Sequence, residues 1–440
     1  MAKSKIVYVC DNCGYSQVGW SGKCPQCNKW GSLVETLSES PNTSSSSKLK
    51  NINVKPKSLS EIKLAQINRI KTNIPELDRV LGGGFVPGQI VLLAGEPGIG
   101  KSTILLEVCQ KLGNSFYASG EESALQIKIR AERLKLDGKN ISLLEETNID
   151  NIISSIQSEN SQNKVNFAVI DSIQTMRTDD LSGMSGSVGQ VRESTYRLVR
   201  MSKTLNIPTV VVGHVTKEGT VGGPALLAHL VDTVLWFEGE KDSQLRVIRA
   251  YKNRFGPTDE TGMFEMKDSG LVSISDPSKV FQSGVGDGVA GVARSVIMQG
   301  TRPVIIEIQS LISKSSFPLP RRVAQGIDAK RLELILAVLS RRCGIDLSTF
   351  DVYVNAVGGI NVKDPAVDLA VALSLASSKF DKPLPKFSVS AGEVGLLGEI
   401  RPVFSQEKRL KEAKSLGYKI VFSPSKFQFL PMAIKEIFSK

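Results

Sequence analysis

Four short apolar runs, separated by segments with helical periodicity, dominate the middle of the chain. They lie at residues 90–94, 115–119, 167–171 and 208–213. Continuous apolar runs of this length that alternate with helices are typical of a mostly parallel sheet buried on both faces. The pattern therefore predicts an α/β domain over residues 65–278.

The apolar pattern is interrupted at two places. Residues 36–64 begin with a stretch rich in Ser, Thr, Asn and Pro that has almost nothing to bury, which predicts a flexible linker. Near residues 275–290, a Ser-Asp-Pro-Ser sequence and a Gly-rich segment break the pattern before it resumes. We expect four segments: a Cys-rich module at 1–35, the linker at 36–64, the first α/β domain at 65–278 and a second at 282–440.

The composition is that of a globular protein with more than one core. The chain has 440 residues, of which 41% are hydrophobic and 22% charged. No apolar run approaches the length that crosses a bilayer, and the first ten residues lack the apolar region and cleavage site of an export signal. These features predict a cytoplasmic protein with no membrane partner.

The charge balance adds a candidate partner. A net charge of +11 at pH 7 favours a polyanion, because Lys and Arg that neutralise phosphates release condensed counterions. The alternative is a basic protein whose charge serves only solubility.

The cysteines are spaced for a metal ion. Four of the six form two Cys-x2-Cys pairs: Cys10, Cys13, Cys24 and Cys27. Two such knuckles separated by ten residues suit a tetrahedral Zn²⁺ and not a disulfide framework. Four protein ligands leave the ion no open position, so we expect structural zinc that stabilises a small ribbon. Whether the ribbon also contacts DNA or a protein stays open.

A phosphate-binding loop follows the first apolar run. Residues 95–102 match G-x4-G-K-[ST] and lie between that run and a helical pattern, the context that makes the motif specific. The predicted nucleotide-binding residues are Gly95, Glu96, Pro97, Gly98, Ile99, Gly100, Lys101, Ser102 and Thr103. Lys101 should reach the β- and γ-phosphates of ATP. Ser102 and Asp171, which ends the third run, should serve the Mg²⁺ ion, with Asp171 acting through water.

A second motif supplies a candidate base for the attacking water. Residues 119–123 read Ser-Gly-Glu-Glu-Ser at the end of the neighbouring apolar run. We predict Glu121 as the catalytic base and keep Glu122 as the fallback. The alternative is that both carboxylates stabilise the start of the helix that follows.

With these motifs the chain resembles the RadA (Sms) family of bacterial DNA-repair ATPases, relatives of the RecA recombinases and of ring helicases. The resemblance covers essentially the entire length. It rests on the four-cysteine ribbon, the phosphate loop, the segments at 120–123 and 213–219, and above all Lys-Asn-Arg-Phe-Gly at 252–256, between strands.

The resemblance gives the last motif a role. Lys252 and Arg254 alternate on an extended segment, so their charges fall on one face. The family implies a homo-oligomer, a hexameric ring with ATP between subunits, in which both residues would stabilise transition-state charge on the neighbour's ATP. The alternative is a contact with the phosphate backbone of DNA.

Three further residues acquire candidate roles. His214 ends the fourth run, where related motors place a sensor of the γ-phosphate; a purely structural histidine is the alternative. Gly/Ser-rich segments at 179–189 and 217–223 occupy the places of DNA loops in RecA-like rings. Arg192 and Lys217 are therefore the predicted DNA-binding residues, with an unpartnered flexible loop as the alternative.

Residues from 282 onward are similar to the proteolytic domain of Lon, most visibly at 357–366 and 391–401. Ala366 stands where that family has its nucleophilic serine, and Glu407 or Lys408 falls near its lysine, so we expect no peptidase activity. The domain would serve as a scaffold. Its basic residues are either an extension of a DNA channel or a solvated face: Arg321, Arg322, Lys330 and Arg331.

Taken together, the sequence predicts an α/β, RecA-like P-loop ATPase that is a Mg²⁺-dependent DNA motor. The resemblance implies recombinational repair by branch migration, with single-stranded DNA, branched intermediates and a RecA-type recombinase as partners. One alternative is a nucleotide-switched DNA-binding or loading protein that does not translocate. Another is an ATP-dependent protease, which Ala366 disfavours.

Overall fold

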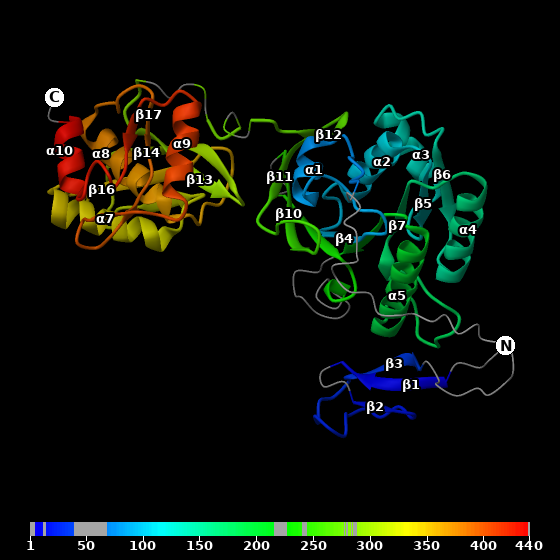
Figure 1. Ribbon diagram of the computed structural model, residues 1–440. Coiled ribbons are helices and arrows are strands. Elements are labelled where there is room, and N and C mark those ends of the chain that lie inside the picture. Colours follow the sequence, from blue (N-terminus) through cyan, green and yellow to red (C-terminus); the bar gives the residue numbers. More distant parts are fainter. Residues whose placement is uncertain are drawn as a thin grey trace, which may run out of the picture. The chain divides into compact units, whose positions relative to one another are not determined.

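The computed structural model describes residues 5–11, 15–38, 68–214, 227–239, 244–276, 278, 280–282, 284 and 288–438. The chain divides into two compact units, Met1–Ser273 and Ile274–Lys440 (Figure 1). In the described part of the chain, no helix combines the length and apolar character needed to span a membrane.

A small antiparallel ribbon begins the first unit. Its strands are β1 (Lys5–Cys10), β2 (Ser16–Gln17) and β3 (Leu33–Ser38), with β1 in the centre. Cys10, Cys24 and Leu33 form most of its buried interior. So few apolar side chains do not fold a module of this size without a further cross-link.

The ATPase-like part of the first unit is built on a nine-stranded sheet in the order β12-β11-β10-β9-β4-β8-β7-β5-β6. The strands are β4 (Ile90–Gly95), β5 (Ser115–Ser119), β6 (Ile141–Glu145), β7 (Phe167–Asp171), β8 (Thr209–His214), β9 (Thr233–Glu238), β10 (Leu245–Asn253), β11 (Thr261–Lys267) and β12 (Gly270–Ser273). Strands β4 to β9 pair in parallel, which confirms the predicted mostly parallel sheet. Strands β10 to β12 add an antiparallel edge.

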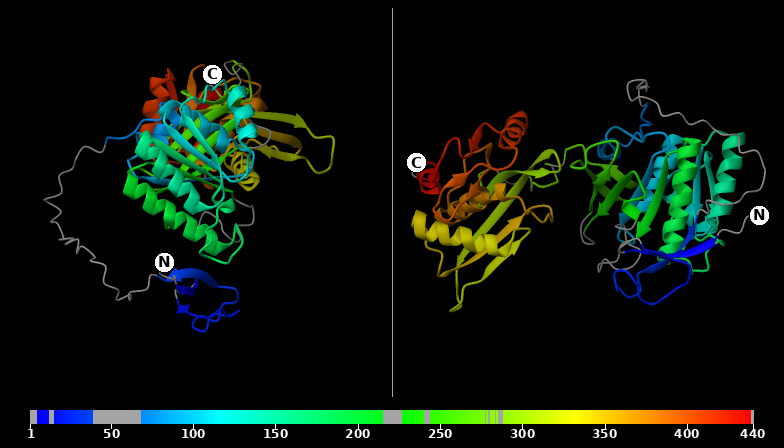
Figure 2. Two further views of the ribbon diagram at one scale, coloured as in Figure 1. Left: turned by 90° about the vertical axis from the view of Figure 1, so that its right-hand side faces the viewer. Right: turned by 60° about the horizontal axis from the view of Figure 1, so that its bottom comes forward.

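Helices cover both faces of this sheet (Figure 2). They are α1 (Pro75–Leu81), α2 (Lys101–Leu112), α3 (Ala124–Arg133), α4 (Ile149–Gln162) and α5 (Val188–Leu205). Alternate residues of each strand point to opposite faces, so β4 contributes Val91 and Leu93 to the core under α1 and α2. Its Ile90 and Leu92 join the core under α4 and α5. Burial on both faces explains why the strands read as unbroken apolar runs.

The second unit contains a mixed six-stranded sheet in the order β15-β16-β14-β13-β17-β20 and a short hairpin. The strands are β13 (Val292–Gln299), β14 (Arg302–Lys314), β15 (Arg322–Gln325), β16 (Phe350–Ala356), β17 (Ser388–Ser390), β18 (Glu393–Val394), β19 (Ile400–Arg401) and β20 (Ile420–Phe422). The helices are α7 (Ala329–Cys343), α8 (Asp368–Phe380), α9 (Gln406–Ser415) and α10 (Leu430–Phe438). Helix α8 is buried along most of its length and forms the centre of this unit.

Candidate active site

The loop between β4 and α2 has the backbone of a phosphate cradle. Gly98 and Gly100 adopt positive φ angles of 77° and 115°, a conformation that a side chain disfavours. A Cβ atom on Gly100 would also lie 2.7 Å from the methyl group of Met266. The loop leads into the N-terminus of α2, where free N–H groups and the helix dipole favour an anion.

Lys101, the first residue of α2, is almost completely buried beside this loop. Its ammonium group donates to the main-chain carbonyls of Gly95 and Glu96, each at 2.9 Å. Burial lowers the pKa of Lys101 below its usual value, and the charges of Asp171 and Glu121 offset part of this shift.

The end of β7 meets the start of α2 through Asp171. One oxygen of this carboxylate accepts from the Ser102 hydroxyl at 2.7 Å and from the Tyr117 hydroxyl at 2.6 Å. Burial raises the pKa of Tyr117 well above its usual range, so its hydroxyl remains a donor. A serine hydroxyl and a carboxylate in contact are the hard oxygen ligands that Mg²⁺ prefers, so this pair fits the ion.

The two neighbouring glutamates have different surroundings. Glu121 accepts from the Ser172 hydroxyl and contacts the His214 ring at 3.2 Å, beside Lys101. The hydrogen bond from His214 lowers the pKa of Glu121, and its carboxylate is therefore ionised at neutral pH. Both carboxylate oxygens of Glu122 instead accept hydrogen bonds from the guanidinium of Arg130 on α3.

The start of α3 is capped by other side chains. Ser123 and Gln126 form a reciprocal capping box, and the Glu145 carboxylate accepts from the Ala124 amide. The helix-capping role that was the alternative for Glu121 and Glu122 is thus taken by Ser123, Gln126 and Glu145.

His214 connects the Lys101 ammonium to the Glu121 carboxylate. It is the last residue of β8 and pairs with Gly95 in the adjacent β4. Its Nδ1 atom lies 3.2 Å from the Lys101 ammonium, and its Nε2 atom lies 3.2 Å from the Glu121 carboxylate. The ends of parallel strands thus bring Lys101, Glu121, Asp171 and His214 into one cluster, although 113 residues separate Lys101 from His214.

Lys252 and Arg254 do not join this cluster. Lys252 pairs with Val234 of β9, which pairs with Leu92 of β4. Across the sheet, Lys252 is therefore aligned with Leu92. Leu92 precedes Gly95, where the phosphate loop begins, by three residues, which is about 10 Å along β4. Strand β10 runs away from the phosphate loop, so Arg254 lies farther still.

Both cations contact the segment just before β9. The Lys252 ammonium donates to the carbonyls of Ala228 and Val231, at 2.6 and 2.8 Å, and Arg254 contacts the Asp232 carboxylate at 3.4 Å. Burial and the nearby charge of Arg254 lower the pKa of Lys252. Lys252 lies within β10, which ends at Asn253, and is not between strands as the sequence indicated, while Arg254 follows the strand and is 55% exposed.

The predicted DNA loop after β7 is extensively hydrogen-bonded. The side-chain amide of Gln190, on α5, donates to the main-chain carbonyls of Leu181 and Gly183 in the loop and of Thr178 just before it. The Ser182 hydroxyl donates to the Glu35 carboxylate of the ribbon at 2.8 Å. Arg192 lies half-buried one turn into α5, whereas Lys217 lies outside the described residues.

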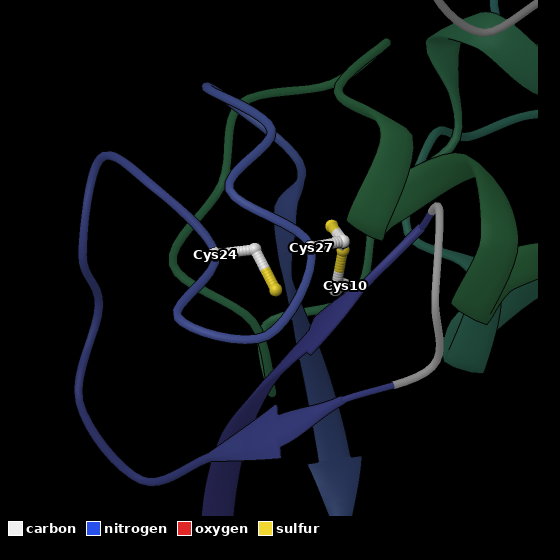
Figure 3. Close-up of side chains that lie close together, drawn as sticks. All are labelled: Cys10, Cys24 and Cys27. Atoms are coloured by element: carbon white, nitrogen blue, oxygen red, sulfur yellow. The ribbon is translucent and has the colours of Figure 1, made fainter.

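The sulfur atoms of Cys10, Cys24 and Cys27 lie together in the ribbon, all within 4.8 Å of one another (Figure 3). Four sulfurs around one zinc ion at about 2.3 Å sit about 3.8 Å apart, so this cluster fits three ligands of such a site. Cys13, the fourth predicted ligand, lies outside the described residues.

Sequence reasoning missed Tyr117 and Gln174 in this region. A tyrosine inside an unbroken apolar run was the available signal for the first, because a buried hydroxyl needs a partner. Gln174 gave no signal, because its partner is the main chain of His214, 40 residues away.

Two family models and several curated relatives are similar to this chain. A family model for the ATPase KaiC matches residues 70–278, and one for a rubredoxin metal-binding domain matches residues 8–35. The chain is 47% identical over 430 residues to the DNA repair protein RadA of Listeria monocytogenes, covering 96% of this chain and 93% of that protein. It is 45% identical to the DNA repair protein RadA of Bacillus subtilis, with 97% and 93% covered.

The chain belongs to the RadA family of DNA repair proteins. This confirms the resemblance inferred from the motifs, and with the KaiC-type ATPase domain it makes the chain an ATP-hydrolysing enzyme. Among solved structures, a KaiC-like protein of Pyrococcus horikoshii OT3 is similar at 20% identity and a TM-score of 0.41, covering 47% of this chain and 99% of that one.

Proposed function

We propose that this RadA-family ATPase is a DNA-dependent motor that acts in recombinational repair and promotes branch migration of recombination intermediates. The observation that carries the proposal is the chain of contacts from Lys101 through His214 to Glu121. It joins the phosphate loop to the end of β8, which leads into a segment with the Gly-rich composition of a DNA loop. Such a link would let ATP hydrolysis and DNA binding influence each other.

Each residue of the cluster has a proposed task. Lys101 binds the β- and γ-phosphates, and the Ser102 hydroxyl and Asp171 hold the Mg²⁺ ion, which neutralises developing phosphate charge. Glu121 accepts a proton from the attacking water, since its carboxylate is ionised and lies beside the cradle. His214 senses the γ-phosphate because it contacts both Lys101 and Glu121.

Lys252 and Arg254 are proposed to act on the ATP of a neighbouring subunit in a homo-oligomer, the hexameric ring of the RadA family. Their distance from the chain's own phosphate loop supports this role. Arg254 is the stronger candidate for an arginine finger, because its side chain is more than half exposed and its guanidinium lies 3.4 Å from the Asp232 carboxylate, a long contact. Lys252 would first have to break its hydrogen bonds to the carbonyls of Ala228 and Val231. The alternative is that Lys252 and Arg254 contact the DNA backbone. Mixing two inactive variants, as described in the Discussion, distinguishes this role from action on a neighbour's ATP.

The remaining proposals concern partners. Arg192 and Lys217 bind the phosphates of single-stranded DNA or branched intermediates, and zinc on Cys10, Cys13, Cys24 and Cys27 stabilises the ribbon. A RecA-type recombinase in the cytoplasm is the proposed protein partner. The second unit, whose sequence resembles Lon, is proposed to be a scaffold without peptidase activity.

The test is the steady-state ATPase rate of the purified protein with and without single-stranded DNA, with Lys101→Ala as the blank. The proposal expects strong stimulation by DNA that vanishes in the variant. A rate that DNA leaves unchanged would contradict DNA-coupled hydrolysis. A strand-displacement assay on a forked substrate then distinguishes a motor from a nucleotide-switched loading protein, because only the motor unwinds the fork.

A further inference from the structure

Two tryptophans lie on the outside of the ribbon. Trp20 follows β2 and is 66% exposed, and Trp30 precedes β3 and is 75% exposed. Tryptophan has one of the largest apolar surfaces of any side chain, so leaving it in water forgoes the stabilisation that burial gives. The interior of the ribbon contains few apolar side chains, yet neither indole contributes to it. Both rings are therefore available to a partner.

The two rings border the same point of the ribbon's surface. A Cβ atom on Gly22 would lie 3.4 Å from the Trp30 ring and 3.7 Å from the Trp20 ring. Because glycine has no side chain, residue 22 does not fill the space that both rings border. Trp20, Gly22 and Trp30 thus form one patch, the tryptophan surface.

Hydrogen bonds hold the two loops that carry these rings. The Gln17 side-chain amide donates to the Ser21 hydroxyl at 2.9 Å, across the loop that contains Trp20. Trp30 forms an antiparallel backbone bridge with Lys23. A ligand that binds the two rings therefore has little additional backbone to order, which lowers the entropic cost of binding.

The charged side chains around the tryptophan surface are cations. From residue 15 to residue 34 the sequence contains two lysines, Lys23 and Lys29, and no Asp or Glu. Each lysine is next in sequence to a residue of the tryptophan surface, and both are exposed. Thiolates that bind zinc also carry negative charge, but Cys10 and Cys24 are buried. The outside of this part of the ribbon therefore favours an anionic ligand.

Aromatic rings beside cations match the chemistry of single-stranded DNA. Its bases stack on aromatic side chains whatever the sequence, and its phosphates bind nearby lysines. In a duplex the base faces are hidden in the stack, so duplex DNA would meet only the lysines. A protein partner would use the same rings, but it would have to supply carboxylates for the lysines. The net charge of +11 and the relatives named as DNA repair proteins favour the nucleic acid.

We propose that the tryptophan surface is a binding site for single-stranded DNA. Bases stack on Trp20 and Trp30, while Lys23 and Lys29 bind the adjoining phosphates. The site deepens the proposed function and rests on it, since it adds a DNA contact outside the ATPase domain. It also gives the ribbon a task besides its own stability, because the fold of the ribbon sets the positions of both rings.

The experiment measures binding of the full-length protein to labelled single-stranded oligo(dT) and to a labelled duplex of equal length, by fluorescence anisotropy without nucleotide. Trp20→Ala and Trp30→Ala each remove one ring, and the corresponding phenylalanine variants keep an aromatic face. The matched control is Val18→Ala, which removes an exposed apolar side chain from the same part of the ribbon but no ring. Zinc content and melting temperature establish that each variant is folded.

Each alanine variant should weaken binding to oligo(dT) at least about fivefold, the lower end of what stacking of one base contributes. The phenylalanine variants and Val18→Ala should stay within about twofold of the wild type. The affinity for the duplex should be unchanged in all of these variants, since its base faces are not accessible. Replacing Lys23 and Lys29 together by alanine should lower the slope of log affinity against log salt concentration by about 1.4, because each phosphate neutralised on a single strand contributes about 0.7.

Three results would overturn this site. The first is an unchanged affinity for oligo(dT) in both alanine variants, which would leave the rings to a protein partner. The second is an equal loss of affinity for the duplex and the single strand, and the third is a loss in Val18→Ala as large as in the tryptophan variants. A wild-type ATPase rate that does not respond to single-stranded DNA would instead contradict the proposed function. The two failures are distinguishable, because one concerns the ribbon variants and the other the unaltered protein.

Discussion

Mixing two inactive variants tests whether Arg254 acts on a neighbour's ATP. Lys101→Ala removes the phosphate-binding cation and Arg254→Ala removes the proposed finger. Within one chain, Lys252 already lies about 10 Å back from the end of β4, and Arg254 lies beyond it, so the chain's own ATP is out of reach. Each variant alone should lose at least about 10³-fold in kcat, the usual contribution of an arginine finger.

The mixture has a calculable activity. In a ring, each site combines the phosphate loop of one subunit with the finger of the next, so the interfaces are heterologous. At equal amounts with random exchange, the loop comes from an Arg254→Ala subunit in half of the sites. In half of those, the finger comes from a Lys101→Ala subunit. The mixture should therefore recover about a quarter of the wild-type ATPase rate per site.

The control is Arg249→Ala, a change within β10 at an arginine that pairs with Glu238 and is 40% exposed. Arg249→Ala alone should retain the wild-type ATPase rate, so its activity should not depend on mixing with a second variant. If the mixture of Lys101→Ala and Arg254→Ala shows no more activity than the two parents after subunit exchange is verified, the reasoning about Arg254 is wrong. A DNA-backbone role would then be favoured, and Arg254→Ala should weaken DNA binding in a salt-dependent manner.

The active site and the ribbon lead to four further predictions. Glu121→Gln should lower kcat about 10²- to 10⁴-fold with ATP binding retained, whereas Glu122→Gln should affect only the pairing with Arg130; equal losses would contradict the assignment of the base. Because the Glu121 pKa is lowered, the wild-type rate should fall on acidification only below the pKa of an ordinary glutamate, as a pH profile of kcat would show. Tyr117→Phe should destabilise the fold by about 1.5–3 kcal/mol, measured by urea unfolding, because Asp171 loses a hydrogen bond to a charged acceptor. A zinc chelator should abolish the ribbon's ordered amide signals in an NMR spectrum while the ATPase rate without DNA persists; unchanged signals would exclude a structural metal.

The parts of the site that sequence alone predicted are those whose chemistry is local. The phosphate loop is contiguous, so its glycines, Lys101 and Ser102 identify one another by spacing. Asp171 was found because a carboxylate that ends an apolar run faces the carboxyl edge of a parallel sheet. The strands were found because burial on both faces leaves an unbroken apolar run.

The parts that sequence left open depend on long-range contacts. The choice between Glu121 and Glu122 depends on Arg130 and His214, neither of which is adjacent to them in sequence. The antiparallel edge β10 to β12 has a mixed burial pattern, since β10 is only partly covered, and it gave no clear run. The loop at 179–189 looked unconstrained from its Gly and Ser content, but Gln190 of α5 binds two of its carbonyls and that of Thr178 just before it.

The packing around Ala366 bears on the proposal that the second unit is a scaffold without peptidase activity. Ala366, which the resemblance to Lon aligns with that family's serine, is completely buried, and its carbonyl accepts from the Ser295 hydroxyl and the Gly392 amide. A serine introduced there would bury its hydroxyl away from any substrate, and a buried hydroxyl needs its own partner. Asp364, which accepts from the Ala366 amide, also binds the buried Arg409 guanidinium at 2.6 Å. A guanidinium stays protonated in proteins and cannot act as the base that a serine requires, so Arg409 could not activate a serine at position 366, which supports the proposed scaffold role.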